Sequence, residues 1–223
     1  MNGNDVDPAG EQTYSPEFSP VSPEAQRRLL CYSRTLLAHA LGVPDTFGGG
    51  EVRSAGSVVE ATAHVADQEP SPPEGDPVYE QALGAFVTLR VEGELRGCIG
   101  SITTDETLVR SVRRRTLDAA FHDRRFPPLT ATELEFLLIE HSVLSSPQCV
   151  RCSHGIVLGE HGMILTVGSA RSVFLPEVPT QQCWTLEETL NALAVKAGLP
   201  KDAWREEDAV LQVFRTQHYG EDR

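Results

Sequence analysis

The chain has 223 residues, of which 40% are hydrophobic, and a formal net charge of −13 at pH 7. This length is enough for a sizeable core, in one large domain or two small ones. Such an acidic balance argues against a nucleic-acid binder, because phosphate contacts require a basic face. The sequence contains no apolar stretch of membrane-spanning length, and its first residues are acidic instead of signal-like. We therefore expect a cytoplasmic protein without a membrane partner.

The first part of the chain predicts a tail followed by a helix. Residues 1–21 combine scattered carboxylates and prolines with no apolar periodicity, which is typical of a flexible acidic tail. Residues 22–220 are expected to form the folded domain. Ser22-Pro23-Glu24 offers an N-cap and a first-turn proline, and leucines recur at helical spacing until Gly42. These features predict a helix over 23–41, and the Pro- and Gly-rich stretch at 66–77 predicts a surface loop.

The central stretch of the sequence is a predicted hairpin over residues 85–101. The first strand is an aromatic and β-branched run that ends at Val91, and Glu92-Gly93 supplies the turn. The second strand is Leu95-Arg96-Gly97-Cys98-Ile99-Gly100-Ser101. In a regular strand, Arg96 and Cys98 share one face. Glycines inside a strand suggest close approach by a ligand or another backbone, and a cation beside a cysteine favours the reactive thiolate.

The elements after the hairpin mix helices and strands without regular alternation. The patterns predict helices at 105–121 and 185–197, the second with a capping box at Thr185-Leu186-Glu187-Glu188. They also predict a helical turn and buried strand over 134–144, a second hairpin over 156–167 and a last strand over 210–216. This arrangement favours an α+β fold with antiparallel sheets flanked by helices.

Several stretches of the sequence match motifs that occur together, in the same order, in one known family. They are the Leu95–Ser101 stretch, Asp123-Arg124-Arg125-Phe126-Pro127-Pro128, Glu133-Leu134, Glu140-His141-Ser142-Val143-Leu144-Ser145, Leu175-Pro176-Glu177-Val178-Pro179, Trp184 and Lys196-Ala197-Gly198-Leu199. With these motifs, roughly residues 24–219 resemble the AMMECR domain family, including AmmeMemoRadiSam system protein A.

The resemblance implies a fold and partners more firmly than a reaction. It implies two closely associated, intertwined α/β subdomains whose boundaries the sequence does not mark. In prokaryotes such domains are encoded with a Memo-like protein and a radical-SAM enzyme, which are the implied partners. The implied activity is that of a small-molecule enzyme or enzyme component.

The candidate site joins the central strand to two of the matched motifs. We expect Cys98 and Glu140 to be catalytic, and Arg96, Gly97, Gly100, Asp123 and Arg125 to bind a small anionic ligand in a cleft. Two arginines can clamp a carboxylate or phosphate, with carboxylates orienting them. The alternative is structural: a buried cysteine, and Asp and Arg side chains that tie loops together.

Histidines near these motifs, and a second group of cysteines, offer further chemistry. His122 and His141 are the local candidates for a base beside Cys98, although the resemblance rests on their acidic neighbours. Cys149-Val150-Arg151-Cys152-Ser153-His154 has the spacing of half a zinc site, but a second clear ligand pair is missing. We therefore predict reduced thiols, no structural metal and no cofactor.

Two functions of different classes remain open from the sequence. One is a small-molecule enzyme or enzyme component with a polar cleft around residues 95–101. The other is a non-catalytic module that binds a partner protein through the same surface. Polar residues in the matched motifs favour the first, because partner surfaces usually rely on exposed aromatic side chains.

Overall fold

The computed structural model describes residues 18, 20–44, 69–150 and 155–222. Almost all of the predicted acidic tail therefore lies outside the described residues, as does the start of the predicted 66–77 loop. The chain divides into two compact units. The larger unit contains Pro20–Val143 and Gln217–Arg223, and the smaller unit contains Leu144–Thr216.

The larger unit begins with helix α1, Pro23–Ala40. Ser22 caps it by accepting a hydrogen bond from the Ala25 N–H at 3.2 Å, and Pro23 occupies the first turn. Residues 69–76 contain no helix or strand, and the short 3₁₀ helix η1, Pro77–Glu80, follows them. The helix expected over 23–41 is confirmed.

Strands β1, Gly84–Val91, and β2, Glu94–Ser101, form the central hairpin. Glu92 and Gly93 make its turn with φ values of 53° and 86°. The antiparallel register shifts at Leu89–Arg90, so Arg90 lies opposite Leu95 and Arg96 is the additional residue on β2. The hairpin expected over 85–101 is confirmed, but β2 is not a regular strand.

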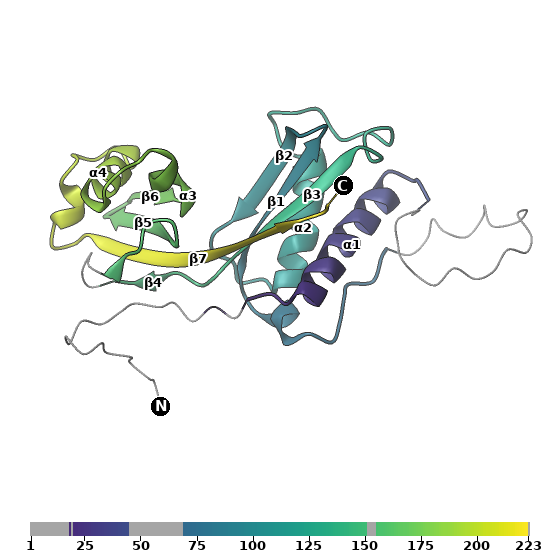
Figure 1. Cartoon of the computed structure of the whole chain (residues 1–223), viewed down its shortest axis with the longest axis horizontal. Coiled ribbons are helices and arrows are strands. Elements are labelled where there is room, and N and C mark those ends of the chain that lie inside the picture. Colours follow the sequence, from purple (N-terminus) through teal and green to yellow (C-terminus); the bar gives the residue numbers. More distant parts are fainter. Residues whose placement is uncertain (1–17, 19, 45–68, 151–154, 223) are drawn as a thin grey trace, which may run out of the picture. The chain divides into compact units, whose positions relative to one another are not determined.

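Helix α2, Leu108–Phe121, packs against this hairpin and lies beside α1 (Figure 1). Strand β3, Leu137–Leu144, follows a turn at 131–136 and alternates buried with partly exposed residues. Within the larger unit the strand order is β2-β1-β3-β7, where β7, Val210–Gly220, contributes its last residues. The two helices cover the sheet face that carries Val87, Leu89 and Ile139, all fully buried.

The smaller unit contains the first part of β7 together with β4, β5, β6 and two helices. Strand β7 pairs with β4 and β5, and β5 pairs with β6, all antiparallel. The bounds are β4 Gln148–Cys149, β5 His161–Val167, β6 Ala170–Phe174, α3 Glu177–Gln181, α4 Leu186–Lys196 and η3 Ala203–Arg205. The capping box of α4 forms as expected, with Thr185 and Glu188 bonding each other's backbone N–H.

The second hairpin lies further along the chain than the sequence predicts. Residues 156–158 are not a strand, and the hairpin is β5–β6, turning at Gly168 with φ of 56°. The reason is local: the His161 ring Nδ1 accepts the Val157 N–H at 3.1 Å and holds 157–161 as a turn. Ile156 is instead a buried loop residue in the core of the smaller unit.

The α+β class with antiparallel sheets and flanking helices is confirmed by these elements. Among the described helices, none has both the length and the apolar character needed to span a membrane.

Candidate functional site

Cys98 lies in β2 directly opposite Thr88 of β1. Its side chain is partly exposed, and its sulfur accepts a hydrogen bond from the Thr88 hydroxyl at 3.3 Å. Paired residues of an antiparallel ladder share a face, so both side chains lie on the sheet face opposite α1 and α2.

Asp123 and Arg125 hold the backbone of Cys98 from the outer edge of β2. The Cys98 N–H donates to Asp123 Oδ2 at 2.9 Å, and Arg125 Nη2 donates to the Cys98 carbonyl at 3.0 Å. The two side chains also form a bidentate ion pair, with Nε–Oδ1 and Nη2–Oδ2 distances of 2.9 and 2.7 Å. The pair occupies the position that a neighbouring strand would take at this residue.

This ion pair is electrostatically stable. Hydrogen bonds from the Arg125 side chain hold the pKa of Asp123 far below its usual range, against the opposing effect of burial. Hydrogen bonds from the Cys98 and Arg125 backbone N–H groups lower this pKa further. The Asp123 side chain is 4% exposed, whereas that of Arg125 is 56% exposed. Arg125 also lies over the Phe126 ring, 5.5 Å from its centroid. The buried carboxylate is thus ionised across the physiological range.

Arg96, the additional residue of β2, binds the segment that follows α2. Its Nε and Nη2 donate to the two carboxylate oxygens of Glu133 at 2.6 and 3.2 Å, and Nη2 also donates to the Pro128 carbonyl at 3.2 Å. The hydrogen bonds from Arg96, followed by those from Thr130, lower the pKa of Glu133 to about 2 against the effect of burial. The Arg96 guanidinium thus bonds Glu133 and Pro128, whereas the Cys98 sulfur bonds the Thr88 hydroxyl.

Gly97 and Gly100 are approached by the protein itself. A Cβ atom at Gly97 would lie 2.2 Å from the Ala119 carbonyl oxygen, so α2 passes close to β2 there. A Cβ atom at Gly100 would lie 2.2 Å from the Phe86 ring, which occupies the space above it.

Glu140, on β3, pairs with Arg90 of β1 instead of with Arg96 or Arg125. Its Oε1 accepts from Arg90 Nε at 3.0 Å, and both side chains are partly exposed. Arg90 follows Thr88 by two residues and shares its face. We call Thr88, Arg90, Cys98 and Glu140 the polar face; it carries a hydroxyl, a guanidinium, a thiol and a carboxylate across three strands.

The sequence-predicted site is thus divided into three groups. Cys98, Asp123 and Arg125 are in direct contact, Arg96 binds Glu133, and Glu140 binds Arg90. The site predicted from the sequence does not include Thr88 and Arg90, because only the strand register places them beside Cys98 and Glu140. Glu133 lies in a matched motif, which could have pointed to it.

Neither histidine near the motifs contacts Cys98 within the described residues. His141 is fully buried on the helix-covered face, where its Nε2 bonds the Ser33 hydroxyl of α1 at 3.0 Å. Burial, with a smaller effect from His218, lowers its pKa to about 3. His122 is exposed at the end of α2 and lies 3.3 Å from Asp118.

The Cys149–His154 stretch lies partly outside the residues that the structure describes. Cys149 is exposed in β4, whereas residues 151–154 are not described. Over the described ranges, the structure contains no cluster of three or more His, Cys, Asp or Glu side chains that could hold a metal ion.

Comparisons with known proteins agree on one family. Residues 52–219 match the family described as AMMECR1. Protein MJ0810 of Methanocaldococcus jannaschii is 35% identical over 152 residues, which are 65% of this chain and 76% of that protein. Protein PH0010 of Pyrococcus horikoshii is 31% identical over 190 residues, covering 81% of this chain and 92% of the relative.

A solved structure supports the same relation. The crystal structure of the uncharacterized protein PH0010 from Pyrococcus horikoshii is similar with a TM-score of 0.63 and 28% sequence identity. The similarity covers 87% of this chain and 90% of that one. Because the sequence match spans most of the chain and the fold matches too, this protein belongs to the AMMECR1 family.

Proposed function

We propose that this protein is an enzyme, or the substrate-binding component of one, that acts on a small anionic or polar molecule at the polar face. The observation that carries the proposal is how Cys98 is held. The Asp123–Arg125 pair bonds both the backbone N–H and the backbone carbonyl of this residue, while the thiol stays partly exposed beside the Thr88 hydroxyl. Such fixing of the backbone around an accessible thiol is what a reacting group requires.

The polar face offers distinct roles to its members. A cysteine is a nucleophile as the thiolate, and the Thr88 hydroxyl donates a hydrogen bond to the Cys98 sulfur. Glu140 is the carboxylate available to accept or donate a proton, and Arg90 is the nearby cation for an anionic substrate. Asp123, Arg125 and Arg96 are positioning residues in this scheme, because their hydrogen bonds are used within the protein.

The alternative is a module that binds a partner protein through the same face. It is favoured by two apolar side chains there: Phe86 is partly exposed, and Leu95 is 37% exposed opposite Arg90. A Memo-like protein and a radical-SAM enzyme are the partners that the family resemblance proposes under either function.

A thermal-shift screen of small polar and anionic metabolites distinguishes the two functions. We expect a metabolite to raise the melting temperature of the wild type, and Cys98→Ser and Glu140→Gln to weaken that effect. Cys31→Ser, which changes an exposed cysteine of α1, is the matched control and should respond as the wild type does. The enzyme proposal is contradicted if no metabolite binds. It is also contradicted if Cys98→Ser leaves the metabolite-induced shifts in melting temperature unchanged while Leu95→Asp abolishes binding of a Memo-like protein.

A further inference from the structure

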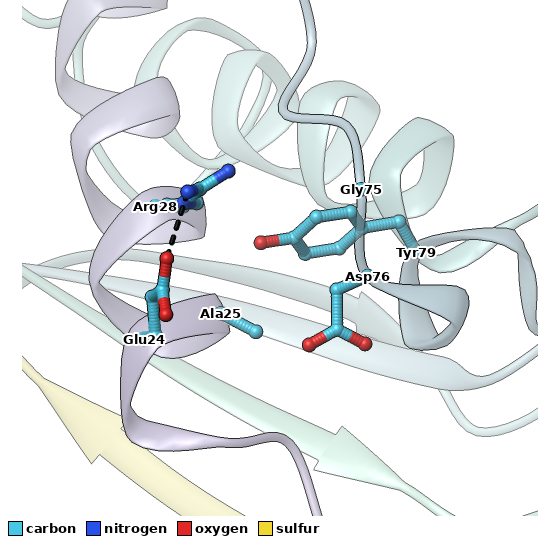
Figure 2. Close-up of a pocket in the computed structure, with 6 residues that line it drawn as sticks. All are labelled: Glu24, Ala25, Arg28, Gly75, Asp76 and Tyr79. Carbon is cyan, nitrogen blue, oxygen red and sulfur yellow. Dashed lines mark hydrogen bonds and ion pairs between the residues drawn. The ribbon is translucent and has the colours of Figure 1, made fainter.

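A second candidate site lies in the larger unit at the start of α1, and none of its residues belongs to the polar face. The structure has a hollow of about 200 Å³ between the first turns of α1 and the segment that leads into η1. Figure 2 shows the residues that line it: Glu24, Ala25, Arg28, Gly75, Asp76 and Tyr79. Its volume is below that of pockets for drug-sized ligands, so a ligand of few atoms is the appropriate class.

Tyr79 supplies the feature that points to a ligand. The residue is 1% exposed, and its hydroxyl oxygen is buried without a hydrogen-bond partner among the described residues. Figure 2 shows the ring extending from η1 toward α1, with the hydroxyl on the side of Ala25 and Arg28. A buried tyrosine hydroxyl normally has a partner, and leaving one unpaired is costly.

The hydroxyl is a donor in this setting. Burial raises the pKa of Tyr79, and the Asp76 and Glu24 carboxylates raise it further, against the opposing effect of Arg28. The group that would complete the site must therefore offer Tyr79 an acceptor atom.

The charged groups around the hollow retain unused hydrogen-bonding capacity of both kinds. Arg28 uses Nη2 for Glu24 Oε1 at 2.7 Å and Nη1 for the Glu74 carbonyl at 3.2 Å, which leaves further N–H donors. Asp76 accepts the Val78 N–H at 3.0 Å and the Ser22 hydroxyl at 3.3 Å, which leaves lone pairs on both oxygens. A matching ligand carries an anionic acceptor and a cationic donor a few atoms apart.

We propose that this hollow binds a small zwitterion of amino-acid size. Its carboxylate accepts hydrogen bonds from the Tyr79 hydroxyl and the Arg28 guanidinium, and its ammonium group lies against Asp76. The site goes beyond the proposed function, because none of its residues contacts Cys98 in the described part of the chain.

Thermal-shift titrations with the twenty common amino acids, each added singly, test this site in the full-length protein. We expect at least one to raise the melting temperature in a saturable manner, whereas acetate and methylamine at equal concentration produce a smaller shift. Tyr79→Phe and Asp76→Asn should each weaken the apparent affinity about tenfold or more, the effect of losing one charge-assisted hydrogen bond. Cys98→Ser should respond as the wild type does, which separates this site from the polar face.

The stability of the two variants without ligand is a second readout. Tyr79→Phe should be as stable as the wild type or more stable, since it removes an unpaired buried hydroxyl. Asp76→Asn keeps a side-chain oxygen that can cap η1. If either variant fails to fold, the other decides. The proposal is overturned if no amino acid shifts the wild type, if acetate alone gives the full shift, or if the folded variants bind unchanged.

Discussion

At Cys98, two side chains from a distant motif bind the backbone of a single residue. Without them, this N–H and carbonyl would be exposed on an edge strand, where they could pair with another chain. Asp123 and Arg125 satisfy both groups and fix the backbone of Cys98. The sequence could suggest that these residues belong together through the family motifs, but not that they bind backbone instead of thiol. That distinction depends on which edge of β2 is unpaired.

His141 gives a prediction at the residue scale. Burial keeps its pKa near 3 in the folded chain, while an unfolded histidine takes up a proton near its ordinary value of 6.5. The contribution of His141 to stability is therefore complete above pH 6.5 and is lost as the pH falls toward 3. The free energy of unfolding should fall by about 1.4 kcal/mol per pH unit at most in this window.

Urea unfolding at pH 7, 6 and 5 measures this slope. His141→Gln should flatten it, whereas His122→Gln, which changes an exposed histidine, should leave it as in the wild type. Equal slopes in wild type and His141→Gln would show that the buried imidazole does not control acid sensitivity.

At the scale of elements, two neighbouring polar residues of β2 have different partners: Arg96 binds Glu133, and the Cys98 sulfur binds Thr88. The additional residue is Arg96, which reaches the segment containing Pro128 and Glu133, while Cys98 stays opposite Thr88. Alternation of side chains could be predicted from the sequence, but a shift of one residue could not. The misplaced second hairpin has a similar origin, since the apolar run at 156–158 fits a strand as well as a loop anchored by Ile156.

The packing of α2 on β2 predicts the effect of a methyl group at Gly97. Gly97→Ala places a Cβ atom 2.2 Å from the Ala119 carbonyl oxygen, which belongs to rigid helix backbone. We expect a loss of about 1–3 kcal/mol in the free energy of unfolding, the usual cost of overpacking. Glu94→Ala, at an exposed position of the same strand, is the control and should change little. Wild-type stability in Gly97→Ala would mean that the helix and strand are not in this close contact.

The Arg96–Glu133 pair ties β2 to the segment after α2. The Arg96 side chain is only 12% exposed, so its bidentate pairing should contribute more than a surface ion pair. A double-mutant cycle with Arg96→Ala and Glu133→Gln at pH 7 should give a coupling free energy of roughly 1–3 kcal/mol. A coupling near zero, together with loss of ligand binding in Arg96→Ala, would instead assign Arg96 to a ligand.

At the scale of the whole molecule, the smaller unit interrupts the larger one along the chain. The larger unit takes residues from both sides of the smaller one, and the divisions fall at Val143–Leu144 and Thr216–Gln217, inside β3 and β7. Domain boundaries are recognised in sequence by Pro-, Gly- or Ser-rich linkers. Continuous strands have no such composition, so the fold class could be predicted but the boundaries could not.

The reactivity of Cys98 is the central claim, and site-resolved alkylation measures it most directly. Limited iodoacetamide treatment followed by peptide mass spectrometry compares Cys98 with the exposed Cys31, Cys149 and Cys183 of the same chain. We predict that Cys98 reacts faster than all three although it is less exposed, and that Arg125→Gln slows Cys98 several-fold without changing the others. Slower reaction of Cys98 than of the exposed cysteines, unaffected by Arg125→Gln, would contradict a reactive site at the polar face.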